Sequence, residues 1–435
     1  MIHQILEFAC FKRIYQATIK IIMKIIKKKP HFAWIVLTGI CIIMGLSRGG
    51  LNNIGGLFMT PVMTELGCGA GEFMLYFSTS SLTTILFLPK AGRFLKKNDI
   101  RVLLVAGLVL QAGSFALLSL LHSIWGWYVL SIPMALGSVF TTQIVGPVLI
   151  GNWFKEYNGL AVGIMMATVG LFGSVLQPFT GMLITGLGWR QAYLILGIAV
   201  MVIGIPVVLL MIRQHPCAKG LTPLGEKESS SYLESDEKVL QGITLMEAKR
   251  TLAFWALIIF MVFATSVACF SQHLPRYASQ MGYDTIFAGK AMGLYMIGTS
   301  TGALILGLLS DRIGTPKAAN IVLLCGLSAF LILIYKSQDP LFFCAASILY
   351  GFSSAAVGTL GPLLTISLFG EKEYSTIYAV VAVGIAFAGM VAPSGFGYAY
   401  DMMQSYTPML WIAVVMLSLC GVSIAIAFHN KSVHT

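Results

Sequence analysis

The sequence predicts an all-α integral membrane protein with twelve transmembrane helices, arranged as two pseudo-symmetric six-helix bundles. Of its 435 residues, 57% are hydrophobic and only 10% are charged, and the mean hydropathy is +0.84. A soluble domain of this size could not keep so apolar a surface in solution. Twelve segments reach the roughly 20 mainly apolar residues that cross a hydrocarbon core of about 30 Å. The two halves of the chain also share one pattern of residues, so the repeating unit is itself a bundle.

Six of the expected spans fall in each half of the chain. In the first half they occupy residues 32–60, 72–89, 102–121, 126–150, 159–184 and 191–212. In the second half they occupy residues 252–278, 287–309, 318–335, 340–368, 375–398 and 407–428. One long hydrophilic segment separates the two sets, so we expect it to join two bundles.

The repeat is read without a gap at an offset of 215 residues. The positions that agree are Gly67 with Gly282, Gly92 with Gly307, Gly146-Pro147 with Gly361-Pro362, Phe154 with Phe369, and Pro178 with Pro393. Carriers built from such repeats bind their substrates between the halves, near the middle of the bilayer. We therefore expect the site at the interface of the two bundles.

The 28 lysine and arginine residues set the expected orientation, because basic residues concentrate in cytoplasmic loops. If both termini are cytoplasmic, nearly all of them lie in tails and loops on that side. The exceptions are Arg48, Arg190, Arg276, Lys290 and Lys336. The net charge of +11 then comes from basic residues that face the anionic lipids of the inner membrane surface, and it does not indicate nucleic-acid binding. We expect a multi-pass protein of the plasma membrane.

The expected segments are a cytoplasmic tail, two bundles, a linker and a second short tail. The first tail covers residues 1–30 and the second covers residues 430–435. The bundles cover residues 31–213 and 251–429, and the linker between them covers residues 214–250. The tail 1–30 is basic and amphipathic, which suits a helix lying at the membrane surface. Met23 is an alternative start to Met1, because the lysines that follow it already supply a positive tail. The linker is expected to be a cytoplasmic tether without activity of its own.

None of the 17 acidic residues falls deep within an expected span. Carriers driven by protons or sodium often place a carboxylate inside the membrane as the ion site, so this chain would need another device. A membrane enzyme would need a catalytic or metal cluster, and a membrane sensor would need a signalling domain; the sequence offers neither. The eight cysteines include no CxxC pair, so we expect no disulfide framework, metal site or cofactor.

Arg48 is unusual among the basic residues, because it lies near the middle of the long apolar stretch 32–63, beside Gly49 and Gly50. A guanidinium there costs roughly 2.5–3.5 kcal/mol on insertion scales unless it faces water or an anion. We expect Arg48 to face the central cavity and to bind a substrate carboxylate through the bidentate geometry that a guanidinium favours. The alternatives are that it extends to the outer interface or pairs with backbone carbonyls freed at the glycines.

Uncharged polar residues and one histidine are further candidates for substrate contact. They are Asn52 and Asn53, about one helical turn after Arg48, with Gln143, Gln177, His273, Tyr76, Tyr295 and Tyr378 in other spans. Each has a structural alternative, since amides often bond between helices and tyrosines often pack or lie at interfaces. His273 is either a hydrogen-bonded structural residue or a group that titrates near neutral pH and couples transport to protons.

A glycine motif with an Asp-Arg pair follows the eighth expected span. It reads Gly307-Leu308-Leu309-Ser310-Asp311-Arg312-Ile313-Gly314. Gly307 allows close helix contact, and the Asp311–Arg312 pair can hydrogen-bond neighbouring helix ends, so the motif is expected to latch one conformation of two rocking bundles. In the first half Gly92 keeps the glycine, but Lys96, followed by Lys97, stands where the acid is expected. A latch there would need other partners.

This motif resembles the signature of the major facilitator superfamily, and the likeness extends over residues 32–428. Within the superfamily the chain is similar to the branch of oxalate/formate antiporters and monocarboxylate carriers. The segments that resemble this branch are Gly45-Leu46-Ser47-Arg48, Trp153-Phe154, Gly159-Leu160-Ala161-Val162-Gly163-Ile164, Gly188-Trp189-Arg190-Gln191-Ala192-Tyr193 and Ser405-Tyr406-Thr407-Pro408. The resemblance implies a carrier that exposes one central site to each side of the membrane in turn.

The chain also departs from that branch. Its oxalate exchangers use basic residues inside helices eight and eleven, whereas residues 291–309 and 375–398 contain none, and the Asp and Arg typical of helix eight in monocarboxylate carriers are missing. We therefore expect the substrate to be a small, singly charged organic anion, a monocarboxylate held by Arg48. The protein is expected to act as a monomer, by uniport, exchange or symport. The alternative within this class is the export of an apolar or cationic drug.

Overall fold

The computed structural model describes residues 31–155, 157–225, 242–370 and 372–431, almost all of which are helical. The expected tail 1–30, with its choice between Met1 and Met23, lies outside the described residues. So do residues 226–241 of the expected linker and residues 432–435.

In the described first half, six elements are long enough to span a bilayer, and several consist of consecutive helices. They are α2 (Phe32–Met44), η1 (Gly45–Asn52) and α3 (Gly55–Leu66); α4 (Ala70–Lys97); α5 (Ile100–Leu117) and η2 (Leu118–Leu120); α6 (Ile124–Ser138), η3 (Val139–Ile144) and α7 (Val145–Trp153); α8 (Asn158–Leu187); and α9 (Trp189–Met211). Segments η1 and η3 are π-helices.

The described second half repeats this order. Its elements are α11 (Leu252–Cys269), η5 (Phe270–Gln272) and α12 (Leu274–Gln280); α13 (Thr285–Ile313); α14 (Thr315–Lys336); α15 (Pro340–Ser354) and α16 (Ala356–Phe369); α17 (Tyr374–Met403); and α18 (Thr407–Lys431). Two short helices, η4 (Pro216–Lys219) and α10 (Leu245–Lys249), lie between the halves in sequence.

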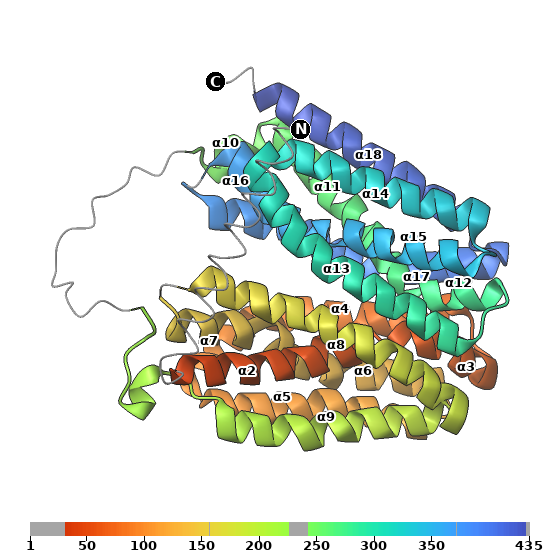
Figure 1. The fold of residues 1–435 in the computed structure, drawn as a ribbon, viewed down its shortest axis with the longest axis horizontal. Helices are drawn as coiled ribbons and strands as arrows, with labels where there is room; N and C mark the ends of the chain where they lie inside the picture. Colours follow the sequence, from red (N-terminus) through yellow and green to blue (C-terminus); the bar gives the residue numbers. More distant parts are fainter. Residues whose placement is uncertain (1–30, 156, 226–241, 371, 432–435) are drawn as a thin grey trace, which may run out of the picture.

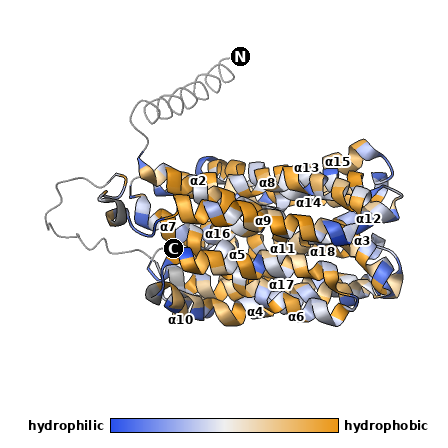
Figure 2. Ribbon diagram, turned by 90° about the horizontal axis from the view of Figure 1, so that it is seen from below, coloured by the Kyte–Doolittle hydropathy of each residue, from blue (hydrophilic) through white to orange (hydrophobic). Residues whose placement is uncertain are grey.

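Among the described residues, eleven of these elements are long and apolar enough to cross a membrane, and α4 is the twelfth long element. The hydropathy of α4 is low because it contains a run of hydroxyl residues, Ser78-Thr79-Ser80-Ser81-Leu82-Thr83-Thr84. In Figure 2, hydrophobic residues dominate along the helices and hydrophilic residues gather at both ends. The expected all-α membrane fold is confirmed. The second span, expected at 72–89, is too short, because the polar ends of α4 extend the helix beyond its apolar part.

Figure 1 shows the two halves as two groups of helices, α2–α9 and α11–α18. Helices α4 and α8 of the first half pack against α17 and α13 of the second half. The halves converge near α3 and α12, and they diverge at the opposite end, near α7 and α16, where the described ends of the linker also lie. We call these the far end and the linker end. The molecule is therefore closed at the far end.

A carboxylate of the second half caps a helix of the first half at the far end. Asp401 of α17 accepts hydrogen bonds from the backbone N–H groups of Ala70 and Gly71, at 2.7 Å each. The counterpart of α4 in the repeat is α13, which is capped by its own Asp284. At the position of Asp284 the first half has Gly69, which has no side chain to cap with. The first turn of α4 therefore takes its cap from the other half, and any opening of the far end breaks it.

Both described ends of the linker are hydrogen-bonded to the bundles at positions that differ by one residue in the repeat. Leu224 donates to the carbonyl of Trp153 at 2.9 Å, and Ile243 donates to the carbonyl of Phe369 at 3.0 Å. Phe154 and Phe369, which the repeat pairs, are both buried. Each half thus binds its own end of the linker at the end of a helix, α7 in the first half and α16 in the second.

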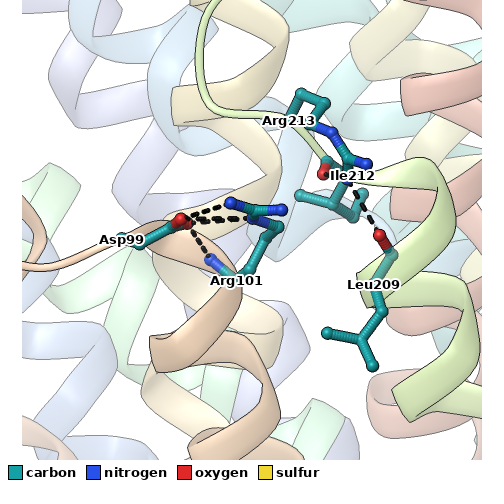
Figure 3. Close-up of polar contacts among 5 residues, drawn as sticks. All are labelled: Asp99, Arg101, Leu209, Ile212 and Arg213. Atoms are coloured by element: carbon teal, nitrogen blue, oxygen red, sulfur yellow. Dashed lines mark hydrogen bonds and ion pairs between the residues drawn. The ribbon is translucent and has the colours of Figure 1, made fainter. Parts of the chain in front are cut away.

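At the linker end, two arginines bind helix ends, as Figure 3 shows. Asp99 accepts the backbone N–H of Arg101 at 2.8 Å and forms an ion pair with its guanidinium at 2.7 Å. Arg213 donates to the carbonyls of Leu209 and Ile212, at 2.9 and 2.6 Å. The hydrogen bond from Arg101 lowers the pKa of the Asp99 carboxyl. Because this pair is exposed, it fixes the helix end without adding much stability.

Close contact between α13 and α15 depends on glycines. A Cβ atom at Gly351 would collide with the carbonyl of Tyr295, and one at Gly298 would collide with the carbonyl of Ile348. Gly358, in the following helix, faces open space. Small residues at such crossings let helix backbones approach closely in a membrane, where dispersion contacts hold helices together.

We predict that Gly351→Ala destabilises the protein by about 1–3 kcal/mol, because the added methyl group forces α13 and α15 apart. The matched control is Gly358→Ala, which adds a methyl group in open space and improves helix propensity by up to about 1 kcal/mol. Thermal unfolding in detergent measures both effects. Equal melting temperatures for the two variants would contradict the role of the contact.

We also predict that Asp401→Ala shifts the protein toward conformations open at the far end, because the first turn of α4 loses an anionic cap that only the closed state supplies. Spin labels at Ser123→Cys and Gln338→Cys, exposed positions at the far end of the two halves, would report a longer mean distance. The control is Asp284→Ala, which removes a cap within one half and should leave that distance unchanged.

A second variant separates gating from helix stability. The combination of Gly69→Asp with Asp401→Ala offers α4 a cap of its own, as α13 has, and the backbone of Gly69 is extended and suits an aspartate. Melting temperature should recover in the double variant, while the label distance stays long. Recovery of the short distance would show that the cap acts only on the stability of α4.

Candidate functional site

A cavity of about 430 Å³ lies between the halves, on the linker side of their contact. Its walls come from η1, α4, α5, η2, α6 and η3 of the first half and from η5 and α17 of the second. Ligand pockets commonly hold about 300–1,000 Å³, so this one is at the small end of the range. It has room for a small molecule.

The two walls of the cavity differ in polarity. The first-half wall presents Asn52, Tyr76, Ser80, Ser81, Thr84, Ser138 and Gln143, together with apolar residues. The second-half wall presents Gln272 and otherwise Ala382, Ile385, Ala386 and Gly389. Most of the hydrogen-bonding capacity therefore belongs to the first half.

Two π-helical segments meet at this site. Segment η1 holds Arg48 and Asn52, segment η3 holds Gln143, and the two segments are in contact. π-Helical turns are rare inside α-helices and often occur at functional sites. Gly49 lets η1 lie against α8, because a Cβ atom there would collide with the carbonyl of Val169. The glycines beside Arg48 thus permit a close helix contact.

Arg48 is partly buried and lies one turn from Asn52, toward the linker end. It is not among the residues that line the cavity. Within the described part of the chain, its guanidinium makes no hydrogen bond or ion pair. The backbone carbonyl of Ser47, beside it, accepts from Gln111 instead. The charge of Arg48 is therefore available to water or to an anion.

Gln111 of α5 is a site residue that the sequence did not single out. Its side chain is fully buried, and its Nε2 donates to Oδ1 of Asn52 at 2.9 Å and to the carbonyl of Ser47 at 3.4 Å. Its Oε1 accepts the hydroxyl of Thr141 at 2.5 Å. One amide side chain thus joins η1 to η3.

Asn53 and Gln177 bond to each other beside the cavity. Nε2 of Gln177 donates to the backbone carbonyl of Asn53 at 2.8 Å, and Nδ2 of Asn53 lies 3.8 Å from the sulfur of Met296 in the second half. Oε1 of Gln177 is buried without a partner among the described residues. Neither residue lines the cavity, so both join helices in this conformation.

His273 is fully buried among aromatic residues in the second half. Its Nε2 lies 2.9 Å from the carbonyl of Pro393 and its Nδ1 lies 3.1 Å from the hydroxyl of Tyr406. A carbonyl only accepts, so Nε2 is the protonated nitrogen and Nδ1 accepts from Tyr406. Both ring nitrogens are occupied, and His273 does not line the cavity.

The three tyrosines predicted as contacts lie in different surroundings. Tyr76 lines the cavity beside Phe77. Tyr295 packs against Tyr350 with ring centroids 4.9 Å apart, and Tyr378 stacks on Tyr374 at 5.8 Å. Of the nine predicted contacts, the structure thus brings Asn52, Tyr76 and Gln143 to the cavity wall and places Arg48 one turn away.

The predicted gating residues lie at the open linker end. Nothing lies within 4 Å of a Cβ atom built at Gly92 or Gly307, and Asp311 and Arg312 are exposed. The side chains of Lys96 and Lys97, the last residues of α4, lie outside the described part of the structure. In this conformation both glycines face open space, and the latch expected from the sequence stays a prediction.

Several lining residues were missed because they are small hydroxyl residues. Ser80, Ser81 and Thr84 of α4 belong to the hydroxyl run that lowers its hydropathy. That run, inside a segment otherwise apolar enough to span a bilayer, was the available signal. Gln111 had no comparable signal beyond its polarity, because its role depends on two helices that approach it from other parts of the chain.

Two pseudo-symmetric helical halves around a central cavity, closed at one end, define the architecture of a membrane carrier. The family model of the Major Facilitator Superfamily matches residues 40–393 and 286–434 of the chain. The chain therefore belongs to that superfamily of transporters and is not an enzyme.

Relatives and a solved structure agree with this assignment. An uncharacterized MFS-type transporter of Escherichia coli strain K12, YhjX, is 23% identical over 81% of this chain and 84% of its own length. Monocarboxylate transporter 12-B of Danio rerio is 24% identical over 91% of this chain and 87% of its own. A bacterial homolog of the human lysosomal transporter Spinster, in an inward-facing and unoccupied conformation, has a TM-score of 0.67 at 14% identity, covering 93% of this chain and 98% of its own. That structure shows the same fold.

We predict that His273→Gln lowers the melting temperature but leaves the pH dependence of transport unchanged. The substitution disturbs two buried hydrogen bonds, each worth about 1 kcal/mol, while the imidazole lies away from the cavity wall. Uptake measured from pH 5 to pH 8 in proteoliposomes, roughly the range in which an ordinary histidine titrates, tests this. Loss of the pH dependence at unchanged stability would instead identify His273 as a proton-coupling group.

Proposed function

We propose that this transporter carries a small organic anion, a monocarboxylate, by alternating access, with Arg48 as the residue that binds the carboxylate. The observation that supports this most directly is the position of Arg48. It lies within a membrane-spanning element, one helical turn from the cavity-lining Asn52, and its guanidinium has no anionic partner among the described residues. An arginine placed in this way needs an anion or water to offset the cost of leaving bulk solvent.

The cavity suits a small molecule with a polar head and an apolar body. Hydroxyl and amide groups on the first-half wall can hydrogen-bond a carboxylate, and the alanine-rich second-half wall offers apolar contact. A single cation near the site matches a single negative charge. The name of the monocarboxylate transporter of Danio rerio, which resembles most of this chain, is in keeping with this substrate class.

We further propose that the linker end faces the cytoplasm, because the basic residues of the chain concentrate in the loops and tails assigned to that side. The conformation described here is then open to the cytoplasm. None of the acidic residues that the structure describes lies deep in a spanning element, so exchange, uniport or transport of a proton together with the anion is preferred to a carrier with its own carboxylate ion site.

The test is counterflow in proteoliposomes with labelled organic acids, with and without a pH gradient. The panel includes monocarboxylates, oxalate, a hexose phosphate and a cationic drug. We predict that a monocarboxylate exchanges and that Arg48→Gln reduces its uptake by about 10-fold to 100-fold, as expected for the loss of a hydrogen-bonded charge pair. Arg101→Gln, which changes an arginine in an exposed ion pair, is the matched control.

Two results would overturn the proposal. One is full uptake of the monocarboxylate by the Arg48→Gln variant at normal expression. The other is exchange of only the cation or only the doubly charged anions, because a site with one guanidinium should reject the first and hold the second weakly.

A further inference from the structure

Gln111 lies behind the cavity wall and touches both π-helical segments. It is fully buried on α5, and its amide group contacts Asn52 and Ser47 of η1 and Thr141 of η3. The cavity lining includes Asn52 but not Gln111. Of its three hydrogen-bond partners, Asn52 alone lines the cavity, so the direct route from Gln111 to a ligand is through Asn52.

The neighbours of Gln111 determine which way its amide group points. The backbone carbonyl of Ser47 can only accept a hydrogen bond, so the atom of Gln111 that faces it must be Nε2. The other hydrogen of that nitrogen points to Asn52, at 2.9 Å. The opposite atom, Oε1, accepts the hydroxyl of Thr141. The amide orientation is thus fixed by chemistry and does not depend on telling oxygen from nitrogen.

The orientation of Gln111 in turn determines that of Asn52. Because Nε2 of Gln111 donates, the atom of Asn52 that faces it must be the acceptor Oδ1. The Nδ2 group of Asn52 has no hydrogen-bond partner among the described residues, so its two N–H donors are free for a ligand in the cavity that this residue lines. They belong to a residue one helical turn from Arg48.

We infer that Gln111 is a positioning residue that makes the site selective for ligands with a hydrogen-bond acceptor, such as a carboxylate, over ligands with a donor at the same place. This inference rests on the proposed function and adds to it. Arg48 supplies the charge, and Asn52, held by Gln111 and Thr141, supplies oriented N–H groups beside it. A ligand whose donor faced Asn52 would leave two N–H groups unpaired, which is a strong basis for rejection.

The first test is Gln111→Glu. A buried glutamate has at most one donor, its O–H when neutral, and the carbonyl of Ser47, which can only accept, takes that hydrogen. No donor is left for Asn52, so the Asn52 amide turns its N–H groups toward the glutamate and presents its oxygen to the cavity. We expect the KM for the monocarboxylate to rise by about tenfold or more, as when a site built for one hydrogen-bonding pattern meets the opposite one. In a background with Asn52→Ala, Gln111→Glu should add much less, because the residue through which it acts is gone.

A matched pair of threonines provides the second test. Thr141→Val removes the donor to Gln111 while keeping the shape of the side chain, and we expect KM to rise by about fivefold. Thr142→Val is the control, because the hydroxyl of Thr142 bonds only within its own element, to the carbonyl of Ser138 at 2.8 Å. Melting temperatures of all variants show whether a change in KM reflects general loss of structure.

The outcomes separate this inference from the proposed function. If the normal protein carries monocarboxylates and Gln111→Glu leaves KM unchanged, or if Thr141→Val and Thr142→Val behave alike, the positioning role is wrong while the proposed function stands. A loss of Vmax alone at unchanged KM would also overturn it. If the normal protein carries none of the acids, the proposed function fails, and the carboxylate assignment fails with it.

Discussion

The contact between the two halves at the far end is the constraint on which the central cavity depends. Helices α4 and α17 meet there, as do α8 and α13, and both pairs separate toward the linker end. The contacts use backbone and small side chains: Gly397 lies against Ala70, and Gly181 lies against Thr285. The hydroxyl of Ser78 also bonds to Ser394 and to the carbonyl of Met390 across the interface. Because these bonds join side chains to backbone and to other side chains, the halves can separate there without breaking a helix.

A second constraint, the need of backbone groups for hydrogen-bond partners inside the membrane, bears on where the polar side chains lie. In hydrocarbon every backbone group needs a partner, and the π-helical segments η1 and η3 alter the usual pattern of such partners within the first half. The buried amide of Gln111 gives one of these backbone groups a partner, because its Nε2 donates to the carbonyl of Ser47. The same amide also donates to Asn52. One side chain therefore both stabilises the backbone of η1 and orients a residue of the cavity wall.

The large-scale fold could be predicted from the sequence because its signals are collective. Hydropathy over whole segments and a repeat at constant offset indicate two six-helix halves. The paired residues Gly67 and Gly282 both have a positive φ, Gly67 as the C-cap of α3 and Gly282 two residues after the end of α12. The site was harder to predict, since it depends on directions of single side chains. Asn52 and Gln143 reach the cavity, whereas Gln177, equally polar, bonds to the backbone of Asn53. The role of Gln111 depends on hydrogen bonds between α5, η1 and η3, and the sequence does not show that these three elements meet at this residue.

The unequal walls of the cavity make the two halves unequal in motion. A molecule bonded to Asn52, Gln143 and the hydroxyls of α4 would stay with the first half as the bundles rock, because the facing part of α17 is mostly alanine and glycine. On the second-half wall only Gln272 offers a hydrogen bond, so few polar contacts have to break as α17 moves past the bound molecule. The first half therefore keeps most of the hydrogen bonds to the molecule, while the second half moves across it largely through apolar contact.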